Sequence, residues 1–339
     1  IDVYRHTFEK KTSAFDFNLF LAFFPQLVAG PIMRAKDLLF QFKESHAFAR
    51  ENFEAGLRLL AWGFFKKTLV ADPIGTIVDP VYAAPHNYNS LGLLLAAYFH
   101  GIQIYCDFSG YSDIAIGVGR IMGYRIPENF RRPFFSGSIA ELWQRWHISL
   151  MAWLRDYVYF PLGGSRVSVF RSYINVFLVM FISGLWHGSD WHFILWGTLC
   201  SVALIVERFF LSFAKIRLFW EKVPFLLRMQ YTIFVFSIPL FYFRARPAEG
   251  YDGPTDVGTT MLKRAFSLES GEHITLLASV LLPMVILFVV DAMMEWKGAL
   301  AEKIASNRFF LYASSLTILG LCFFIYSVTT SAPFLYFQF

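Results

Sequence analysis

The chain has 339 residues, of which 56% are hydrophobic and only 16% are charged. An average soluble domain is about 25% charged, so a chain this poor in charge is excluded from that class, and much of its surface must face lipid. The Lys and Arg residues behind the net charge of +5 lie in short stretches between apolar runs, which favours the positive-inside pattern of membrane proteins over nucleic-acid binding.

Apolar runs of about 20 residues, the length that crosses a bilayer, predict membrane-spanning helices. Two further apolar stretches are broken: 17–33 contains Pro25, Gly30 and Pro31, and 107–123 begins with polar residues. Broken segments persist at membrane depth only where they pack on protein or line a wet cavity. We therefore expect an all-α, polytopic membrane protein with re-entrant or broken helices around a central cavity. The uninterrupted runs are 53–71, 91–106, 172–187, 191–213, 229–243, 274–292 and 309–330.

The basic stretches 155–171, 208–228 and 297–308 alternate correctly across the expected spans, which places them in the cytoplasm. The loop 244–273 then lies outside the membrane, as its Gly, Pro, Asp and Glu content indicates, although it also carries basic residues. No internal repeat is visible, so one membrane domain is expected over 1–339. No signal peptide precedes Ile1, and we interpret the chain as starting inside a longer protein.

The three cysteines, Cys106, Cys200 and Cys322, are far apart in apolar surroundings. They fit neither a metal-ligand spacing nor a disulfide framework, so we expect them to pack as small apolar residues, and we expect no metal. The chain also lacks G-x-S-x-G, C-x-x-C and H-E-x-x-H motifs. Histidine remains the candidate for chemistry, because neutral imidazole accepts a proton near pH 7.

Two histidines have informative surroundings. On a helix over 141–158, His147 lies at the centre of the apolar face, where a core histidine with one hydrogen bond is the simpler interpretation. His187 lies where two apolar runs meet in a very short turn between Gly184 and Gly188. An ionisable residue there is a functional candidate, and an exposed histidine in a tight hairpin explains it equally well.

Polar residues near these histidines have two interpretations. Asp190 either orients a histidine or caps the next helix, and His192 is either a partner or a bystander. The polar run 106–113 suits a helix cap, through Ser112 or Asp113, and a role in lining a cavity is compatible with that cap. Its candidate lining residues are Asp107, Ser109 and Asp113. Arg131 and Arg132 suit a cytoplasmic turn or the phosphates of a donor.

Several runs together resemble the membrane-bound O-acyltransferase family, in its bacterial alginate O-acetyltransferase branch. The resemblance covers nearly the whole chain in the right order. The runs are FFPQLVAGPIMR at 23–34, YCDFSGYSDIAIGVGRIMGYRIPENFRRPF at 105–134, ELWQRWHISLMAWLRDYVYFPLGGSR at 141–166, GLWHGSDWHFILWG at 184–197 and FYFRA at 241–245.

This resemblance implies that His187 is the family's near-invariant histidine and His147 its second functional one, both near a cavity reached from opposite membrane faces. It implies a multi-pass protein of the bacterial inner membrane. The donor would be acetyl-CoA or another acetyl thioester, with no permanently bound cofactor, and the acceptor an extracytoplasmic polysaccharide, with a partner acetyltransferase or polysaccharide-modifying protein. We add Trp186 and Arg155 to the expected lining.

The chain departs from the family pattern in some places, and other functions also explain its features. Family chains of this branch begin with further transmembrane helices, and Asp190 and His192 stand where small, apolar or neutral residues are usual. D-alanyl transfer onto teichoic acid is the nearest rival. A proton-coupled secondary transporter also explains broken helices and buried ionisable groups, and a non-catalytic scaffold is the third alternative.

Overall fold

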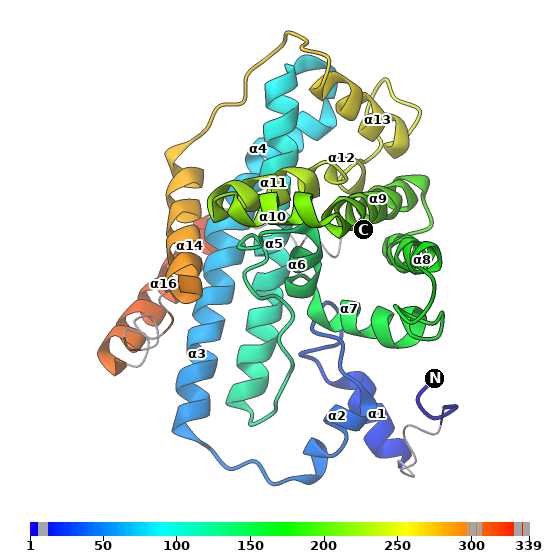
Figure 1. Ribbon diagram of the computed structural model, residues 1–339. Coiled ribbons are helices and arrows are strands. Elements are labelled where there is room, and N and C mark those ends of the chain that lie inside the picture. The colour runs from blue at the N-terminus through cyan, green and yellow to red at the C-terminus, as the bar shows by residue number, and fades with distance from the viewer. Residues whose placement is uncertain (6–12, 297, 299–302, 304–306, 329–333, 335–339) are drawn as a thin grey trace.

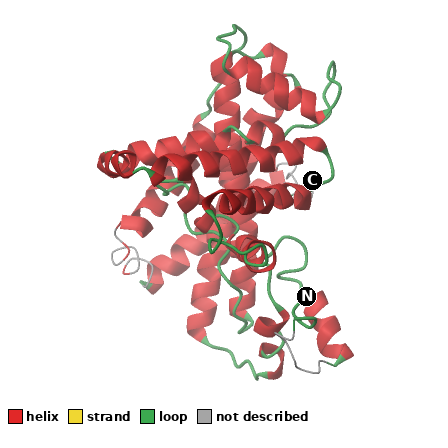
Figure 2. Ribbon diagram, turned by 45° about the vertical axis from the view of Figure 1, so that its right-hand side comes forward, coloured by secondary structure: helices red, strands yellow, loops and turns green. Residues whose placement is uncertain are grey.

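The computed structural model describes residues 1–5, 13–296, 298, 303, 307–328 and 334. In this part of the chain the regular secondary structure is helical, and the one β-type contact is an isolated bridge between Tyr88 and Glu272 (Figures 1 and 2). Among the described helices, five are long and apolar enough to cross a membrane. This confirms the all-α, multi-span prediction. The five helices are α5 (Ser90–Ile121), α8 (Val169–His187), α9 (Trp191–Ser212), α14 (Ala278–Trp296) and α16 (Arg308–Val328).

Helix α5 forms the centre of the molecule, and α3 (Arg50–Phe64) runs beside it (Figure 1). The two backbones approach closely because glycines face each other: a Cβ on Gly63 would lie 2.6 Å from the Gly110 carbonyl oxygen, and one on Gly110 would lie 2.8 Å from that of Gly63. Small residues permit such contacts between membrane helices. In contrast, α16 lies at the periphery: 17% of its most apolar stretch is buried inside the protein, whereas 78% of that of α5 is buried.

The prediction that 107–123 forms a broken segment is wrong, because α5 continues through it without interruption. Its polar side chains meet two lysines of a π-helical turn, η2 (Phe65–Ala71), which links α3 to α4 (Asp72–Ala83). Lys67 pairs with Asp107 and Lys66 with Asp113. The side chains are satisfied by a neighbouring element, so the helix does not need to break around them.

The single helix expected over 141–158 is also wrong. The segment divides into α6 (Ile139–Arg145), α7 (Ile148–Leu154) and a π-helical turn, η4 (Arg155–Tyr159). His147 stands at the break with φ of 44°, in the left-handed region that non-glycine residues rarely adopt.

Segment 17–33 is broken as expected: α1 (Ala14–Ala22) ends before Phe23, and turns follow. The expected span 229–243 is interrupted at Pro239, between α11 (Phe225–Ser237) and α12 (Leu240–Phe243). The loop 244–273 contains α13 (Pro254–Ala265), which packs on α12 and α5. Short elements complete the described chain: α2 (Ala35–Leu38), η1 (Gln41–Lys43), η3 (Pro85–Asn87) and α10 (Ala214–Lys222).

Two segments named in the sequence analysis include residues that the structure does not describe. Most of the basic stretch 297–308, and residues 329 and 330 at the end of the span 309–330, lie outside the described residues.

Candidate functional site

His147 and His187 line the same cavity, of about 40 Å³. A cavity of this volume holds a few water molecules. His147 comes from the break between α6 and α7, and His187 is the last residue of α8, so the fold brings together two histidines that are 40 positions apart in the sequence. Asp107 of α5 also contributes to the wall. Six of the other lining side chains are aromatic: Phe108, Trp143, Trp146, Trp196, Phe236 and Phe243.

Asn129 fixes the orientation and the tautomer of His147. Its Oδ1 accepts a backbone hydrogen bond from Ser149 N at 3.3 Å, and a backbone N–H can only donate, so this atom is the amide oxygen. The His147 Nδ1, 3.1 Å from the same oxygen, therefore carries the proton. In the neutral ring Nε2 is then the proton acceptor. Asn129 is fully buried and was missed in the sequence, where it stands between charged residues in a Pro- and Arg-rich run.

Asn129 also explains the left-handed backbone conformation of His147. The N–H of Ile148 donates to the Asn129 carbonyl oxygen at 2.8 Å, and the Ser149 hydroxyl donates to Oδ1 at 2.8 Å. These bonds satisfy the first N–H groups of α7, as a capping residue does, and they support the turn that holds His147 in the left-handed region.

His187 is held by packing alone. Its ring lies edge-on to Trp196, with centroids 5.1 Å apart, and to Phe243 at 5.0 Å. Among the described residues, no hydrogen-bond partner meets either of its ring nitrogens, so both are available to a ligand in the cavity. His192, in contrast, donates from Nδ1 to the Tyr242 carbonyl oxygen at 3.0 Å and lies outside the cavity lining.

Two buried lysines organise the acidic residues of α5. Lys67 Nζ lies 2.9 Å from Asp107 and 2.7 Å from Asp72. Lys66 Nζ lies 2.6 Å from Asp113 and donates to Ser109 at 2.9 Å. Asp107 thus reaches the cavity, whereas Ser109 and Asp113 serve this second ion pair. The signal in the sequence was the Lys66-Lys67 pair inside an apolar run, since charges at membrane depth are costly unless paired.

The remaining candidates lie around the cavity. Trp186 and His147 line an adjoining cavity of about 490 Å³ beside residues 26–30. Arg155 lines another of about 580 Å³, which shares Met151 with the central one. The small cavity containing both histidines therefore lies between two larger ones. Asp190 occupies the N-cap position of α9 with its side chain making no capping hydrogen bond, and it lines none of these cavities.

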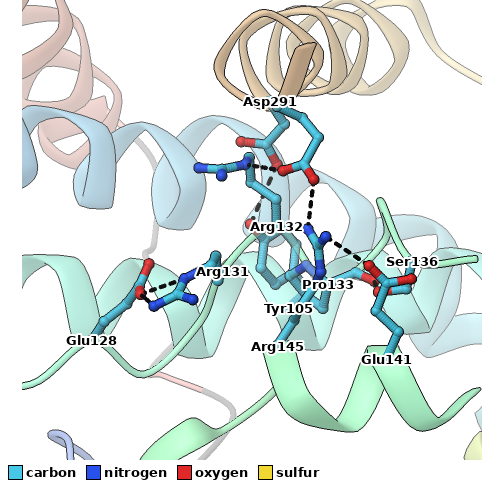
Figure 3. A network of polar contacts seen from close by, with 10 residues as sticks. Tyr105, Glu128, Arg131, Arg132, Pro133, Ser136, Glu141, Arg145 and Asp291 are labelled. Atoms are coloured by element: carbon cyan, nitrogen blue, oxygen red, sulfur yellow. Dashed lines mark hydrogen bonds and ion pairs between the residues drawn. The ribbon is translucent and has the colours of Figure 1, made fainter. Parts of the chain in front are cut away.

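Arg131 and Arg132 are both paired with carboxylates. Arg131 meets Glu128 at 2.5 Å (Figure 3), and Arg132 meets Glu295 of α14 at 2.8 Å. In the part of the chain that the structure describes, no group of three or more His, Cys, Asp or Glu side chains is arranged to hold a metal ion.

The sequence matches one family of known proteins. The model of the membrane-bound O-acyltransferase family matches residues 5–244. A probable alginate O-acetylase of Pseudomonas putida is 44% identical over 208 residues, which cover 61% of this chain and 42% of that protein. A peptidoglycan O-acetyltransferase of Helicobacter pylori is 37% identical over 236 residues, 69% of this chain and 44% of that protein.

A teichoic acid D-alanyltransferase of Bacillus subtilis is 34% identical over 210 residues, which cover 58% of this chain and 52% of that protein. The matched stretches thus span about half or less of each relative.

Proposed function

Because the chain belongs to the membrane-bound O-acyltransferase family, we propose that this multi-pass membrane protein transfers an acetyl group from a cytoplasmic thioester to hydroxyls of an extracytoplasmic polysaccharide. The observation that carries the proposal is the cavity that His147 and His187 line together. The names of the alginate and peptidoglycan relatives support acetyl as the group and a polysaccharide as the acceptor.

His187 acts as the general base in this proposal. It takes the proton of an acceptor hydroxyl while the hydroxyl oxygen attacks the thioester carbonyl carbon. The tetrahedral intermediate collapses, the carbon–sulfur bond breaks, and the proton returns from His187 to the thiolate. One ester and one thiol result, so no net proton is gained or lost. General base catalysis contributes about 10²–10⁴ in rate, and the small, mostly aromatic cavity limits the access of water to the thioester.

His147 orients the reacting groups. Its Nδ1–H donates to Asn129, so its Nε2 is free of a proton. This nitrogen accepts a hydrogen bond from the acceptor hydroxyl and can share the hydroxyl proton. Asp107, held by Lys67, supplies a fixed negative charge in the same wall. Such preorganised groups need no rearrangement during the reaction.

The two larger cavities suit the two substrates. The one that shares Met151 with the centre is lined by Arg155 and Arg208, and both belong to the basic stretches assigned to the cytoplasm. Guanidinium groups suit the phosphates of a coenzyme A thioester, so we assign the donor to this side. The cavity with Trp186 and His147 then receives the acceptor, or a relay group on a partner protein. This arrangement fits a bacterial inner membrane and needs no permanently bound cofactor.

The test is restoration of O-acetyl esters on the envelope polysaccharide of a strain that lacks the gene. The protein from the complete gene is expected to restore them, His187→Ala to fail at equal membrane abundance, and His86→Ala, which alters an exposed histidine, to behave as wild type. Restoration by His187→Ala contradicts the assignment. Supplying a carrier-protein thioester in place of acetyl-CoA distinguishes D-alanyl transfer. Solute flux without any ester product supports a transporter instead.

A further inference from the structure

Helix α14 carries two carboxylates, one turn apart: Asp291 faces α5, and Glu295 faces the connection from α5 to α7 (122–147), a loop that includes the short helix α6 and ends at His147. Asp291 accepts a hydrogen bond from the Tyr105 hydroxyl at 3.3 Å. Glu295 accepts from two arginines: Arg132 Nε at 2.8 Å and Arg145 at 2.9 Å. Figure 3 shows Arg132 and Arg145 on the side of the loop that faces α14. This helix lies beyond residues 5–244, the part matched by the family.

The two arginines mark the two strained points of the loop. Arg132 has φ of 43° and His147 has φ of 44°. A non-glycine residue in this region costs roughly 1–2 kcal/mol, so surrounding contacts must hold each one. Arg132 is held directly by Glu295, and Arg145 lies two positions before His147.

The backbone connects these points to the catalytic ring. The Arg131 N–H donates to the Arg145 carbonyl oxygen at 2.9 Å, and the Ile148 N–H donates to that of Asn129 at 2.8 Å. These two bonds flank His147 and tie it to the segment that carries Asn129 and Arg132. A displacement at Arg132 or Arg145 is therefore passed to both sides of the imidazole.

We propose that Glu295 is a positioning residue for His147: its carboxylate joins Arg132 to Arg145 and so fixes the loop that orients the imidazole in the cavity. Its side chain is 17% exposed, so this charge is shielded from water more than an ordinary surface pair. Removing it leaves both arginines without their shared partner. Misplacement of a reacting group by about 1 Å can cost about 10²-fold in rate.

Glu128 provides a matched control. It pairs with Arg131 on the same loop, but its side chain is 44% exposed, and the two paired side chains hydrogen-bond to each other and not to the side chain of Arg132 or His147. Exposed pairs of this kind contribute little to stability. Glu128→Gln thus removes the same charge from the same loop without breaking the link from α14.

The experiment uses the complete protein in membranes and two readouts. The first is the steady-state rate of acetyl transfer, a readout that rests on the proposed function. Glu295→Gln is expected to lower kcat about 10–100-fold with little change in KM for the donor, and Glu295→Asp to recover part of the loss. Glu128→Gln is expected to stay within about twofold of wild type.

The second readout does not need the activity. Diethyl pyrocarbonate modifies the unprotonated imidazole nitrogen, and mass spectrometry gives the rate at His147 alone. The expected rate changes at least about threefold in Glu295→Gln and is unchanged in Glu128→Gln. An unchanged rate and kcat in a folded Glu295→Gln protein overturn the inference. If wild type transfers no acetyl group, the proposed function fails, while the modification rate still decides the role of Glu295.

Discussion

Replacing Asn129 with alanine tests how the structure prepares His147. The substitution removes the oxygen that accepts from His147 Nδ1–H, the Ser149 N–H and the Ser149 hydroxyl. The hydroxyl can turn away, which leaves the two N–H donors without this acceptor. Each buried donor left without a partner costs about 1–3 kcal/mol, so the folded state is expected to lose about 2–6 kcal/mol. The ring also loses the bond that sets its tautomer, and acetyl transfer is expected to fall about 10²-fold.

The matched variant is Asn129→Asp, which keeps the shape and an acceptor oxygen at the same place. Ser112, which now accepts from Asn129 Nδ2 at 3.1 Å, can turn its hydroxyl to donate instead. We expect the order of activity to be wild type, then Asn129→Asp, then Asn129→Ala. The assay is transfer of labelled acetyl groups in membranes, with thermal stability measured in detergent. Wild-type activity in a folded Asn129→Ala protein, or equal losses in the two variants, refutes the tautomer argument.

Further predictions concern the scaffold, and thermal unfolding in detergent measures the first two. Lys67→Met removes the ammonium between Asp107 and Asp72 and is expected to destabilise the protein by about 3–5 kcal/mol; a loss below about 1 kcal/mol contradicts the buried pairing. Gly110→Ala places a Cβ 2.8 Å from the Gly63 carbonyl oxygen and is expected to cost about 1–3 kcal/mol, whereas Gly320→Ala on α16 meets nothing within 4 Å and serves as its control. Hydrogen bonds from Arg155 and Arg34 lower the pKa of Asp156, so its contribution to stability is complete above about pH 4 and is lost as the pH falls through the lowered value. Proteolysis near Arg34 is expected to increase on that acidification, and Asp156→Asn is expected to show the increase already at pH 7. Equal cleavage of Asp156→Asn and wild type at pH 7 refutes a stabilising role for the Asp156 carboxylate.

Sequence patterns predicted the fold class because apolar length alone determines what crosses a bilayer. They failed where a distant element satisfies a polar group. The run 107–123 was expected to break at its polar start, but Lys66 and Lys67, about 40 positions earlier, pair with its aspartates and let α5 continue. The same limit hid the break at His147, which depends on Asn129 accepting backbone bonds from a segment almost 20 positions away.

The candidate site shows the same contrast between what the local sequence predicts and what depends on distant elements. The local sequence around each histidine was explained equally well or better by a structural role without function. Only the resemblance of the ordered motifs to a family favoured a functional role for both. The structure brings His147, His187 and Asp107 to one cavity, while Asp190 lies outside it and Ser109 and Asp113 bind Lys66. No periodicity argument could place three residues from separate helices at one point, because that depends on how α5, α7 and α8 pack.

The most direct test of the account is a transfer assay with purified protein, labelled acetyl-CoA and isolated polysaccharide, comparing wild type with His187→Ala and His86→Ala. The account predicts label on polysaccharide hydroxyls with wild type and His86→Ala, and a loss of at least about 10²-fold with His187→Ala. Undiminished transfer by His187→Ala would contradict the central claim that this histidine is the base.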